Sequence, residues 1–589
     1  DRRSLTVWLS AQRGENVLDA LGAGSAATLV VSQPATHTTL QLKAGSATRV
    51  AVSAAHKLAS ARCVAAFGTE LDALNYGTGM AALVTAALPA DHLVGLRLAP
   101  EVVFDQTPGP QSGKVLAGAL RTRGGVRSNT GAAIRQGASR NPANARMNIP
   151  LESLRPCLDG AMPAVVATSA PDGTPNVAYV SQVHFVDARH VALSFQFFSK
   201  TRENVLAHPY AEVQVIEPGS FRHYRLRIQY LRTETAGPLF EYMRAQLAGI
   251  AAKTGMDKVF VLRGADIYRV LDIENVDPQL QPAPPLPDAL LALRRAFDHL
   301  GACDDLALLA DRALAALAHG FGIRHALLAM LDAKLDAAPG APGSALYTLA
   351  SQGYPVSGVG AEVALGEGLI GVAAQEKIPV RINHRTPDYT YHAALRVADP
   401  ALPRIPLPVL ANPHSQIAVP LVHGDRLLGV LYAESEHDAF FSPTDEDALV
   451  VYGRHLAALI DRIAALPDDE AAPGALPAAT QSGAPLAVRY FAHDHSVFID
   501  NDYLIKGVAG SILWALLNEH AAHGRREFSN RELRRDPRLP LPDFADNLET
   551  RLILLQRRLA ERCPDIALEK TGRGRFRLNL ARPLALGAA

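Results

Sequence analysis

Cysteine, net charge and long apolar runs are scarce or missing in this chain of 589 residues. The four cysteines lie far apart and form no Cys-x-x-Cys pair, which excludes a disulfide-stapled scaffold and a cysteine-based zinc site. Lys and Arg together number 58, as do Asp and Glu, so no overall charge directs the chain to nucleic acid or membrane. Apolar runs such as Ala326–Leu331 fall far short of the roughly 20 residues that cross a bilayer, and no signal peptide opens the sequence. We therefore predict a cytoplasmic protein with no membrane partner and no metal.

The length predicts several domains, about three to five by usual domain size. Two stretches rich in Pro and Ala, 277–287 and 467–486, are typical of linkers. The polar stretch 121–147 has almost no apolar periodicity and is typical of a surface connection. These boundaries predict four folded parts, at 1–120, 148–276, 288–466 and 487–582. Because the chain starts at Asp1 within a strand-like run, we also expect residues to precede it.

An ordered set of landmarks recurs in the first two parts. Glu15-Asn-Val-Leu18 recurs as Glu203-Asn-Val-Leu206, and an alternating β-type run follows each. Leu-Arg-x-Ala then recurs at 96–99 and 262–265. Because the order is kept, we predict a duplicated β-rich fold whose two copies pack as a pseudo-dimer.

The second part carries a motif suited to phosphate. Strands are predicted at 164–168, 176–182 and 190–198, with the turn Pro171-Asp-Gly-Thr174 closing a hairpin. The segment Phe197–Asn204 then opens a helix. It brings hydroxyls from Ser199 and Thr201, positive charge from Lys200 and Arg202, and backbone N–H groups at the helix start, which together suit a phosphate group.

Here the sequence resembles the FMN-binding split barrels of the pyridoxamine 5′-phosphate oxidase-like superfamily, across 149–276. The resemblance rests on Ala170–Val177, on Ser199–Asn204 and on the helix-ending His208-Pro209. It implies FMN as cofactor, with the flavin phosphate at the Ser-Lys-Thr step and the ring along the strand 179–183. The residues implied to bind the cofactor are Ser199, Lys200, Thr201, Asn204, Ser181 and Gln182. The alternative is a barrel that has lost its flavin.

The first copy has lost most of this motif. Aligning Glu15 with Glu203 places Ala11, Gln12 and Arg13 where the second copy has Ser-Lys-Thr. If flavin binds at the interface of two barrels, as the resemblance implies, the chain keeps one intact site and one vestigial site. The stretch Pro238–Lys258 is predicted to be an amphipathic helix with Leu239, Met243 and Leu247 in the core.

The third part changes to an α+β pattern. We predict an opening helix at 290–319, a closing helix at 444–466 and four strands between them. The glycine run Gly366–Gly371, the strands 418–421 and 429–432, and Phe441–Glu446 resemble GAF domains, which implies a sheet backed by paired helices and a pocket for a small-molecule effector. The residues that can line this pocket are His384, Tyr389, Tyr391, His392 and His414. The alternatives are that these side chains face solvent, or that the domain serves dimerisation; a homodimer is expected.

The fourth part resembles the winged-helix effector domain of response regulators. A short hairpin, two helices, a long helix at 543–562 and a hairpin turning at Gly572-Arg-Gly574 follow in that order. The resemblance implies that the long helix reads the major groove of double-stranded DNA and that the wing contacts phosphate. Between 488 and 582 there are 17 Lys and Arg residues against 13 Asp and Glu. The candidate DNA-binding residues are Arg551, Arg557, Arg558, Lys570, Arg573, Arg575 and Arg577.

The predicted reader helix also has features that favour a protein contact. Asp546 and Glu549 lie at its start, and Ile553, Leu554 and Leu555 occupy positions where the family usually has polar or basic residues. Acidic groups weaken binding to DNA phosphate, and leucines cannot read base edges. Docking to a partner protein or dimerisation is therefore the alternative to DNA binding.

The predicted fold is thus multidomain and mixed α and β: two split β-barrels, one α+β GAF domain and one C-terminal winged helix. The leading functional hypothesis is a one-component transcriptional regulator that couples flavin or small-molecule sensing to a winged-helix output. A flavin-dependent oxidoreductase and a cofactor-free scaffold are the alternatives. No catalytic residue can be assigned, because the sequence shows no Ser-His-Asp order, P-loop, or kinase or cyclase signature.

Overall fold

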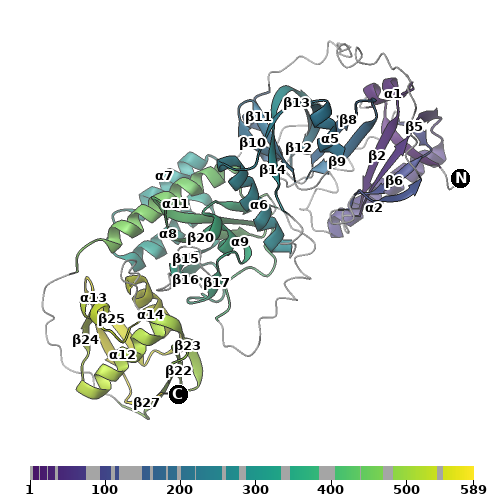
Figure 1. Ribbon diagram of the computed structural model, residues 1–589. Coiled ribbons are helices and arrows are strands. Elements are labelled where there is room, and N and C mark those ends of the chain that lie inside the picture. The colour runs from purple at the N-terminus through teal and green to yellow at the C-terminus, as the bar shows by residue number, and fades with distance from the viewer. Residues whose placement is uncertain are drawn as a thin grey trace. The chain divides into compact units, whose positions relative to one another are not determined.

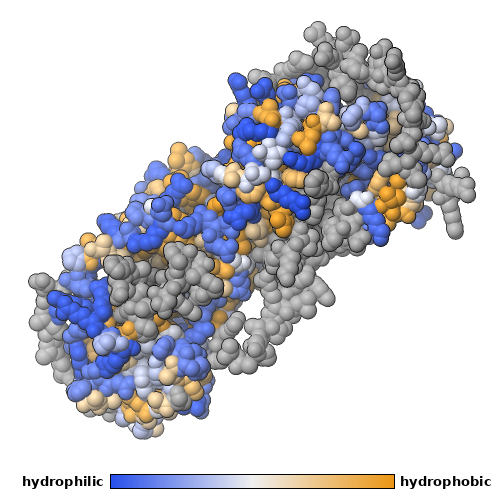
Figure 2. Space-filling model, viewed as in Figure 1, coloured by the Kyte–Doolittle hydropathy of each residue, from blue (hydrophilic) through white to orange (hydrophobic). Residues whose placement is uncertain are grey.

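In the computed structural model the chain divides into two compact units, whose helices and strands are labelled in Figure 1. One unit comprises 1–287 with two short segments, 382–392 and 437–443, and the other comprises the rest of the chain. On the face seen in Figure 2, hydrophilic and hydrophobic residues are interspersed, as the balanced composition predicts. The structure describes residues 4–11, 14–22, 24–33, 38–73, 93–107, 113–118, 149–158, 164–180, 183–195, 200–218, 220–254, 261–276, 287–332, 345–383, 405–437, 439–468, 482–539 and 548–588.

Residues 149–276, the second segment, fold around one seven-stranded antiparallel sheet with the order β10-β11-β14-β13-β12-β8-β9. The hairpin predicted at 171–174 joins β8 to β9 as expected. Its elements are η2 (Leu151–Leu158), β8 (Ala164–Ser169), β9 (Pro175–Val180), β10 (Val183–Asp187), β11 (His190–Phe195), α5 (Lys200–Ala207), β12 (Tyr210–Ile216), β13 (His223–Glu234), α6 (Pro238–Thr254) and β14 (Gly264–Asn275).

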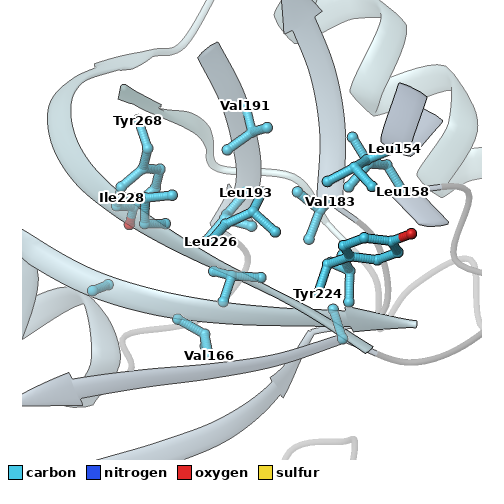
Figure 3. Packing of buried hydrophobic residues seen from close by; sticks show 14 of the residues in the cluster. Leu154, Leu158, Val166, Val183, Val191, Leu193, Tyr224, Leu226, Ile228 and Tyr268 are labelled. Carbon is cyan, nitrogen blue, oxygen red and sulfur yellow. The ribbon is translucent and has the colours of Figure 1, made fainter. Parts of the chain in front are cut away.

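The larger core cluster of the second segment lies on one face of this sheet. Alternation along β12 and β13 directs Val213, Leu226 and Ile228 inward, where none of the three exposes any surface. Figure 3 shows these strands' side chains meeting those of Val183 and Leu193. Each such side chain contributes roughly 1.5–3 kcal/mol by leaving water. A second cluster includes Met243 and Leu247 of α6, which confirms the predicted core face of that helix.

Residues 4–118, the first segment, follow the same order of elements in shorter pieces. β1 pairs with β5 as β11 pairs with β14, β2 pairs with β3 as β12 pairs with β13, and β3 pairs with β6 as β13 pairs with β14. The sheets are β1-β5-β4 and β2-β3-β6-β7. The elements are β1 (Leu5–Ser10), α1 (Glu15–Gly22), β2 (Ala27–Ser32), β3 (Thr39–Ala44), β4 (Ala47–Val50), α2 (Ala54–Ala73), β5 (Leu93–Leu98), β6 (Val102–Asp105) and β7 (Val115–Gly118).

The short sequence landmarks used to align the two segments do not coincide in this comparison. In the first segment, Leu98 of β5 lies opposite Leu5 of β1. In the second, Arg269 of β14 lies opposite His190 of β11. The Leu-Arg-x-Ala sequence therefore falls at the end of β5 but at the start of β14. In the helices, Leu18 and Val205 are buried, whereas Val17 and Leu206 are exposed. The correspondence therefore lies in the strand pairing and not in the short sequence matches.

Residues 287–466, the third segment, form a six-stranded sheet with the order β17-β16-β15-β20-β19-β18. Gly371 sits at the start of α9 where a Cβ would overlap the carbonyl oxygen of Ala364, which explains the glycine at that place. The elements are α7 (Ala289–Leu300), α8 (Leu306–Phe321), β15 (His325–Asp332), β16 (Ala345–Gln352), β17 (Glu362–Ala364), α9 (Gly368–Glu376), β18 (Val380–Ile382), β19 (Ser415–His423), β20 (Arg426–Ser435) and α11 (Pro443–Ala464).

The single opening helix predicted at 290–319 is wrong, because the structure has two helices there. Gly301, with φ of 57°, ends α7, and the Asp305 side chain accepts from Leu308 N to start α8. The glycine and the Asx cap were readable in the sequence, but the continuous apolar spacing concealed them. The closing helix and the four predicted strands are present, whereas the short strands β17 and β18 were not predicted.

Residues 482–588, the C-terminal segment, contain two small sheets and three helices. The sheets have the orders β23-β22-β21-β27 and β24-β26-β25, and β27 pairs in parallel with β21 beyond the predicted boundary at 582. Ser529 caps the start of α13 in a full capping box with Glu532. The elements are β21 (Leu486–Phe491), β22 (Ser496–Ile499), β23 (Asp502–Ile505), α12 (Gly507–His523), β24 (Glu527–Ser529), α13 (Asn530–Arg535), α14 (Leu548–Arg562), β25 (Ile566–Gly572), β26 (Arg575–Leu580) and β27 (Leu584–Ala588).

Candidate functional site

A buried polar cluster lies at the start of α5 in the second segment. Asn176 Nδ2 donates to Thr201 Oγ1 at 3.1 Å, and Asn204 Nδ2 donates to Thr168 Oγ1 at 3.1 Å. Asn204 is 1% exposed, and among the described residues its Oδ1 has no hydrogen-bond partner. The structure therefore brings the predicted Thr201 and Asn204 together around an acceptor that remains available to a ligand donor.

The two cations of the predicted phosphate motif have different surroundings. Lys200 Nζ is half-exposed and lies 3.0 Å from Glu203 Oε2, an exposed pair that holds the amine only weakly. Arg202 instead donates to Asp266 and Thr233 and stacks 4.0 Å from the Phe195 ring. The expectation that Arg202 charge serves a phosphate is thus corrected, because Asp266 already compensates it. The other predicted residues, Ser199, Ser181 and Gln182, lie outside the described residues.

The first segment contacts this cluster from β2 and β3. Thr28 Oγ1 donates to the Pro175 carbonyl at 2.8 Å, and Gln41 Nε2 donates to Asn176 Oδ1 at 3.3 Å and to the Val177 carbonyl at 2.6 Å. Gln41 is only 3% exposed. Sequence reasoning missed these residues; the one available signal was the alternation of polar Gln41 and Lys43 along a strand.

The third segment holds a buried carboxylate that the sequence did not reveal. Glu434 is 1% exposed, accepts from Leu410 N and from Tyr432 Oη at 2.8 Å, and Tyr432 Oη in turn accepts from Gln416. Burial raises the pKa of Glu434, and burial together with the Glu434 carboxylate raises the pKa of Tyr432. The carboxylate is thus held by hydrogen bonds inside the third segment.

Of the predicted effector-binding residues, only His414 lies within the described chain. Its backbone N–H donates to the Ser435 carbonyl at 2.9 Å, next to Glu434, and its Nε2 lies 3.4 Å from Asn412 Nδ2. His384, Tyr389, Tyr391 and His392 lie outside the described residues. His414 is thus near the buried carboxylate in the sheet, whereas the other four keep the status of predictions.

The helix predicted to read DNA, α14, contacts the third segment. Arg551 is 2% exposed and its Nη2 donates to Asp332 Oδ1 at 2.5 Å. Arg557 Nη2 donates to Asp311 Oδ1 at 2.7 Å and its Nη1 donates to the Leu349 carbonyl at 3.2 Å. Both guanidinium groups therefore face the third segment in this structure.

The hairpin of β25 and β26, predicted to be the wing, makes contacts of the same kind. Lys570 Nζ lies 2.5 Å from Asp305 Oδ2; although burial alone would lower its pKa, that carboxylate raises it. Arg573 Nη2 donates to the Ile463 carbonyl at 2.6 Å. Two other predicted residues bond within the C-terminal segment: Arg558 Nε donates to the Leu504 carbonyl at 2.9 Å, and Arg577 donates to Glu527. Arg575 lies in β26, partly exposed.

Two family models match the chain. Residues 303–461 match that of the GAF domain, and residues 151–270 match that of pyridoxamine 5′-phosphate oxidase. A GAF domain and a pyridoxamine 5′-phosphate oxidase-type domain are thus detected within these two ranges. No curated protein matches the chain at a significant level.

Among solved structures, similar ones exist for both domains. An FMN-binding protein from Syntrophomonas wolfei is 16% identical, with 21% of this chain and 85% of that chain covered and a TM-score of 0.19. The GAF domain of an Acinetobacter phosphoenolpyruvate-protein phosphotransferase is 22% identical, with 31% and 98% covered and a TM-score of 0.24. The free methionine-R-sulfoxide reductase from Neisseria meningitidis is 22% identical, with 31% and 95% covered and a TM-score of 0.23.

No described helix is long and apolar enough to cross a membrane. Within the same residues, no group of three or more His, Cys, Asp or Glu side chains is arranged to hold a metal ion.

Proposed function

We propose that the protein is a sensor in which the split barrel binds FMN, the GAF domain binds a small-molecule effector, and the C-terminal segment is a winged-helix output. We further propose that the first segment is a second, degenerate copy of the split barrel, on the strength of the shared order of strand pairing. The observation that carries the sensor proposal is the contact of α14 with the GAF domain. It links the ligand-binding domain directly to the surface that an output domain would use.

The chemistry of this contact suits a reversible latch. Arg551 and Arg557 of α14 pair with Asp332 and Asp311 of the GAF domain, so basic groups suited to DNA phosphate contact protein carboxylates instead. Ser357 Oγ of the GAF domain also donates to Glu561 Oε1 of α14 at 2.5 Å. A DNA duplex and the GAF domain would compete for the same arginines.

The contact also lies close in sequence to the buried Glu434 network. Ser357 belongs to the turn after β16, three residues beyond Tyr354. Burial and the Glu434 carboxylate raise the pKa of Tyr354, which places its hydroxyl in the field of that carboxylate. A ligand that binds the network with different affinity in the docked and undocked states would shift the population of free α14.

The proposal is tested from the GAF side, so that the fold of the C-terminal segment is left intact. Asp332→Ala leaves the Arg551 guanidinium buried without its carboxylate, which costs about 3 kcal/mol if α14 stays docked. We expect faster hydrogen exchange in α14 and stronger binding to a mixed-sequence DNA duplex in fluorescence anisotropy. Asp298→Ala, which removes an exposed pair with Arg294 in α7, is the control and should change neither.

The outcomes separate the alternatives. Faster exchange with gained DNA binding supports a DNA-directed output, and faster exchange without it indicates that α14 serves a protein contact. Unchanged exchange in α14 would contradict the latch.

The flavin assignment has its own test. FMN would be held at Lys200, Thr201 and Asn204 and would supply redox chemistry or a flavin signal when bound. We expect the purified protein to absorb as a flavoprotein and to release FMN on heating, and Lys200→Ala to lose it, whereas Lys57→Ala on the exposed face of α2 should retain it. A colourless protein that takes up no added FMN would reject the assignment and leave the GAF domain as the sensing part.

A flavin-dependent oxidoreductase remains the second candidate, favoured by the match of residues 151–270 to the pyridoxamine 5′-phosphate oxidase model. It is distinguished by steady consumption of NAD(P)H by the flavin-loaded protein, which a sensor does not need. A cofactor-free scaffold predicts neither bound flavin nor any effect of Asp332→Ala on ligand response.

A further inference from the structure

The first segment joins the second beside the motif proposed to hold the flavin phosphate. Gln41 contacts Asn176, and Asn176 contacts Thr201, so an unbroken line of side-chain hydrogen bonds leads from β3 to the start of α5. Thr28 adds a contact to the carbonyl of Pro175 in β9. The first segment is thereby fixed against this site.

Strand geometry places Lys43 next to this contact. Side chains two residues apart in a strand share a face, so Lys43 is on the same face of β3 as Gln41. β3 pairs Gln41 with Phe104 and Lys43 with Val102, and the Lys43 amine lies 5.7 Å from the centre of the Phe104 ring. The amine is therefore held on the side of β3 that faces the second segment.

Lys43 also lies within the field of Lys200. Burial, and then the positive charge of Lys200, lower the pKa of Lys43, while the Asp172 carboxylate in the turn between β8 and β9 acts in the opposite direction. Two ammonium groups from different segments thus interact with each other electrostatically, and one carboxylate interacts with Lys43 in the opposite sense. An anion between the two would relieve their repulsion and the cost of burying Lys43.

We propose that Lys43 and Lys200 bind one phosphate monoester between them, so that the first segment supplies half of the cationic site for the flavin phosphate. This inference rests on the proposed FMN binding by the split barrel. Lys200 is joined to Glu203 only by an exposed pair and can turn to the phosphate. The buried Asn204 Oδ1 supplies an acceptor for a hydroxyl of the same ligand. The first segment is accordingly a working part of the site.

The test compares FMN with riboflavin, which lacks the phosphate, by quenching of flavin fluorescence on the full chain. A charge-assisted hydrogen bond contributes enough for Lys43→Met to weaken FMN binding by about tenfold or more. The same variant should leave riboflavin binding unchanged, so that the preference for FMN falls. Lys57→Met, an exposed lysine of the same segment, is the matched control, and the melting temperature of each variant reports its folding.

Each outcome decides the inference. Equal weakening of FMN and riboflavin would show that Lys43 acts only by packing, and unchanged FMN affinity would remove it from the site while leaving the proposed function intact. If the native chain binds no FMN, its melting temperature is compared in inorganic phosphate and in chloride at equal ionic strength. Stabilisation by phosphate that is lost in Lys43→Met would support the anion site and reject the flavin. Absence of both effects would overturn both proposals.

Discussion

The first segment and the split barrel pair their strands in one order but bury opposite faces of equivalent strands. In β13 of the split barrel, Leu226 and Ile228 are fully buried, while Arg225 and Arg227 face outward and pair with Glu274 and Asp272. In β3 the apolar Leu42 is only half-buried, whereas Gln41 on the other face is 3% exposed. The same strand pattern therefore buries apolar side chains in the core of the split barrel. In the first segment it buries Gln41 at the contact with the second segment.

The largest expected effect tests the apolar core of the split barrel. Leu226→Ala should cost about 2–5 kcal/mol because it opens a cavity in a fully buried site. The equivalent Leu42→Ala should cost about 1 kcal/mol, since its side chain is already partly in water. Hydrogen exchange of the strands in each segment measures both, and equal costs would contradict the contrast.

A second effect depends on pH and is confined to the split barrel. His184 in β10 is buried, and burial lowers its pKa to about 4. An unfolded histidine takes up a proton near pH 6.5, so between the two values the unfolded state binds more protons and stability falls as the pH falls. We expect the split barrel to lose about 2 kcal/mol between about pH 7.5 and about pH 5.

His184→Phe keeps the volume and removes the titrating group. Its unfolding, followed by calorimetry at both pH values, should lack this decrease while other pH effects remain. A decrease of the same size in the variant would assign it to other groups.

The smallest effect compares the polar faces. Gln41→Ala leaves the buried Asn176 oxygen without that donor and should cost about 1 kcal/mol or more. Arg225→Ala, at the equivalent place on β13, removes a pair that is partly exposed and should cost less than about 1 kcal/mol. Thermal unfolding of the two variants measures both costs. A larger loss of stability for Arg225→Ala than for Gln41→Ala would contradict the assignment of a buried polar face to β3 and an exposed one to β13.

Local features of the fold were predictable from the sequence, and contacts between distant segments were not. The hairpin at 171–174, the Ser529 cap and the closing helix α11 depend on neighbouring residues, so their patterns are visible in the sequence. The partners of Arg202, Gln41 and Glu434 are set by strand order, which no local pattern encodes. The predicted repeat shows the same limit, because the strand pairing of the two segments is alike while the short sequence matches that suggested a repeat fall out of register.

At the candidate sites, the sequence predicted which residues lie there better than it predicted what those residues bind. Lys200, Thr201 and Asn204 lie at the predicted helix start, but the arginines predicted for DNA on α14 meet carboxylates and carbonyls of the GAF domain. Arginine suits carboxylate and phosphate equally well, so the sequence could not distinguish between these partners.

The parallel pairing of β21 with β27 bears on the order in which the chain can fold. β21 is the first strand of the C-terminal segment and pairs with β27, the last one, so this sheet is complete only after residue 588 has been synthesised. The strands of the GAF domain all precede it and can already be assembled, since domains emerging from the ribosome fold in order. Asp332 and Asp311 are then in place before α14 is made. The GAF domain would thus act as a template on which the last domain completes its structure, and the docked state would be the one in which each new molecule starts.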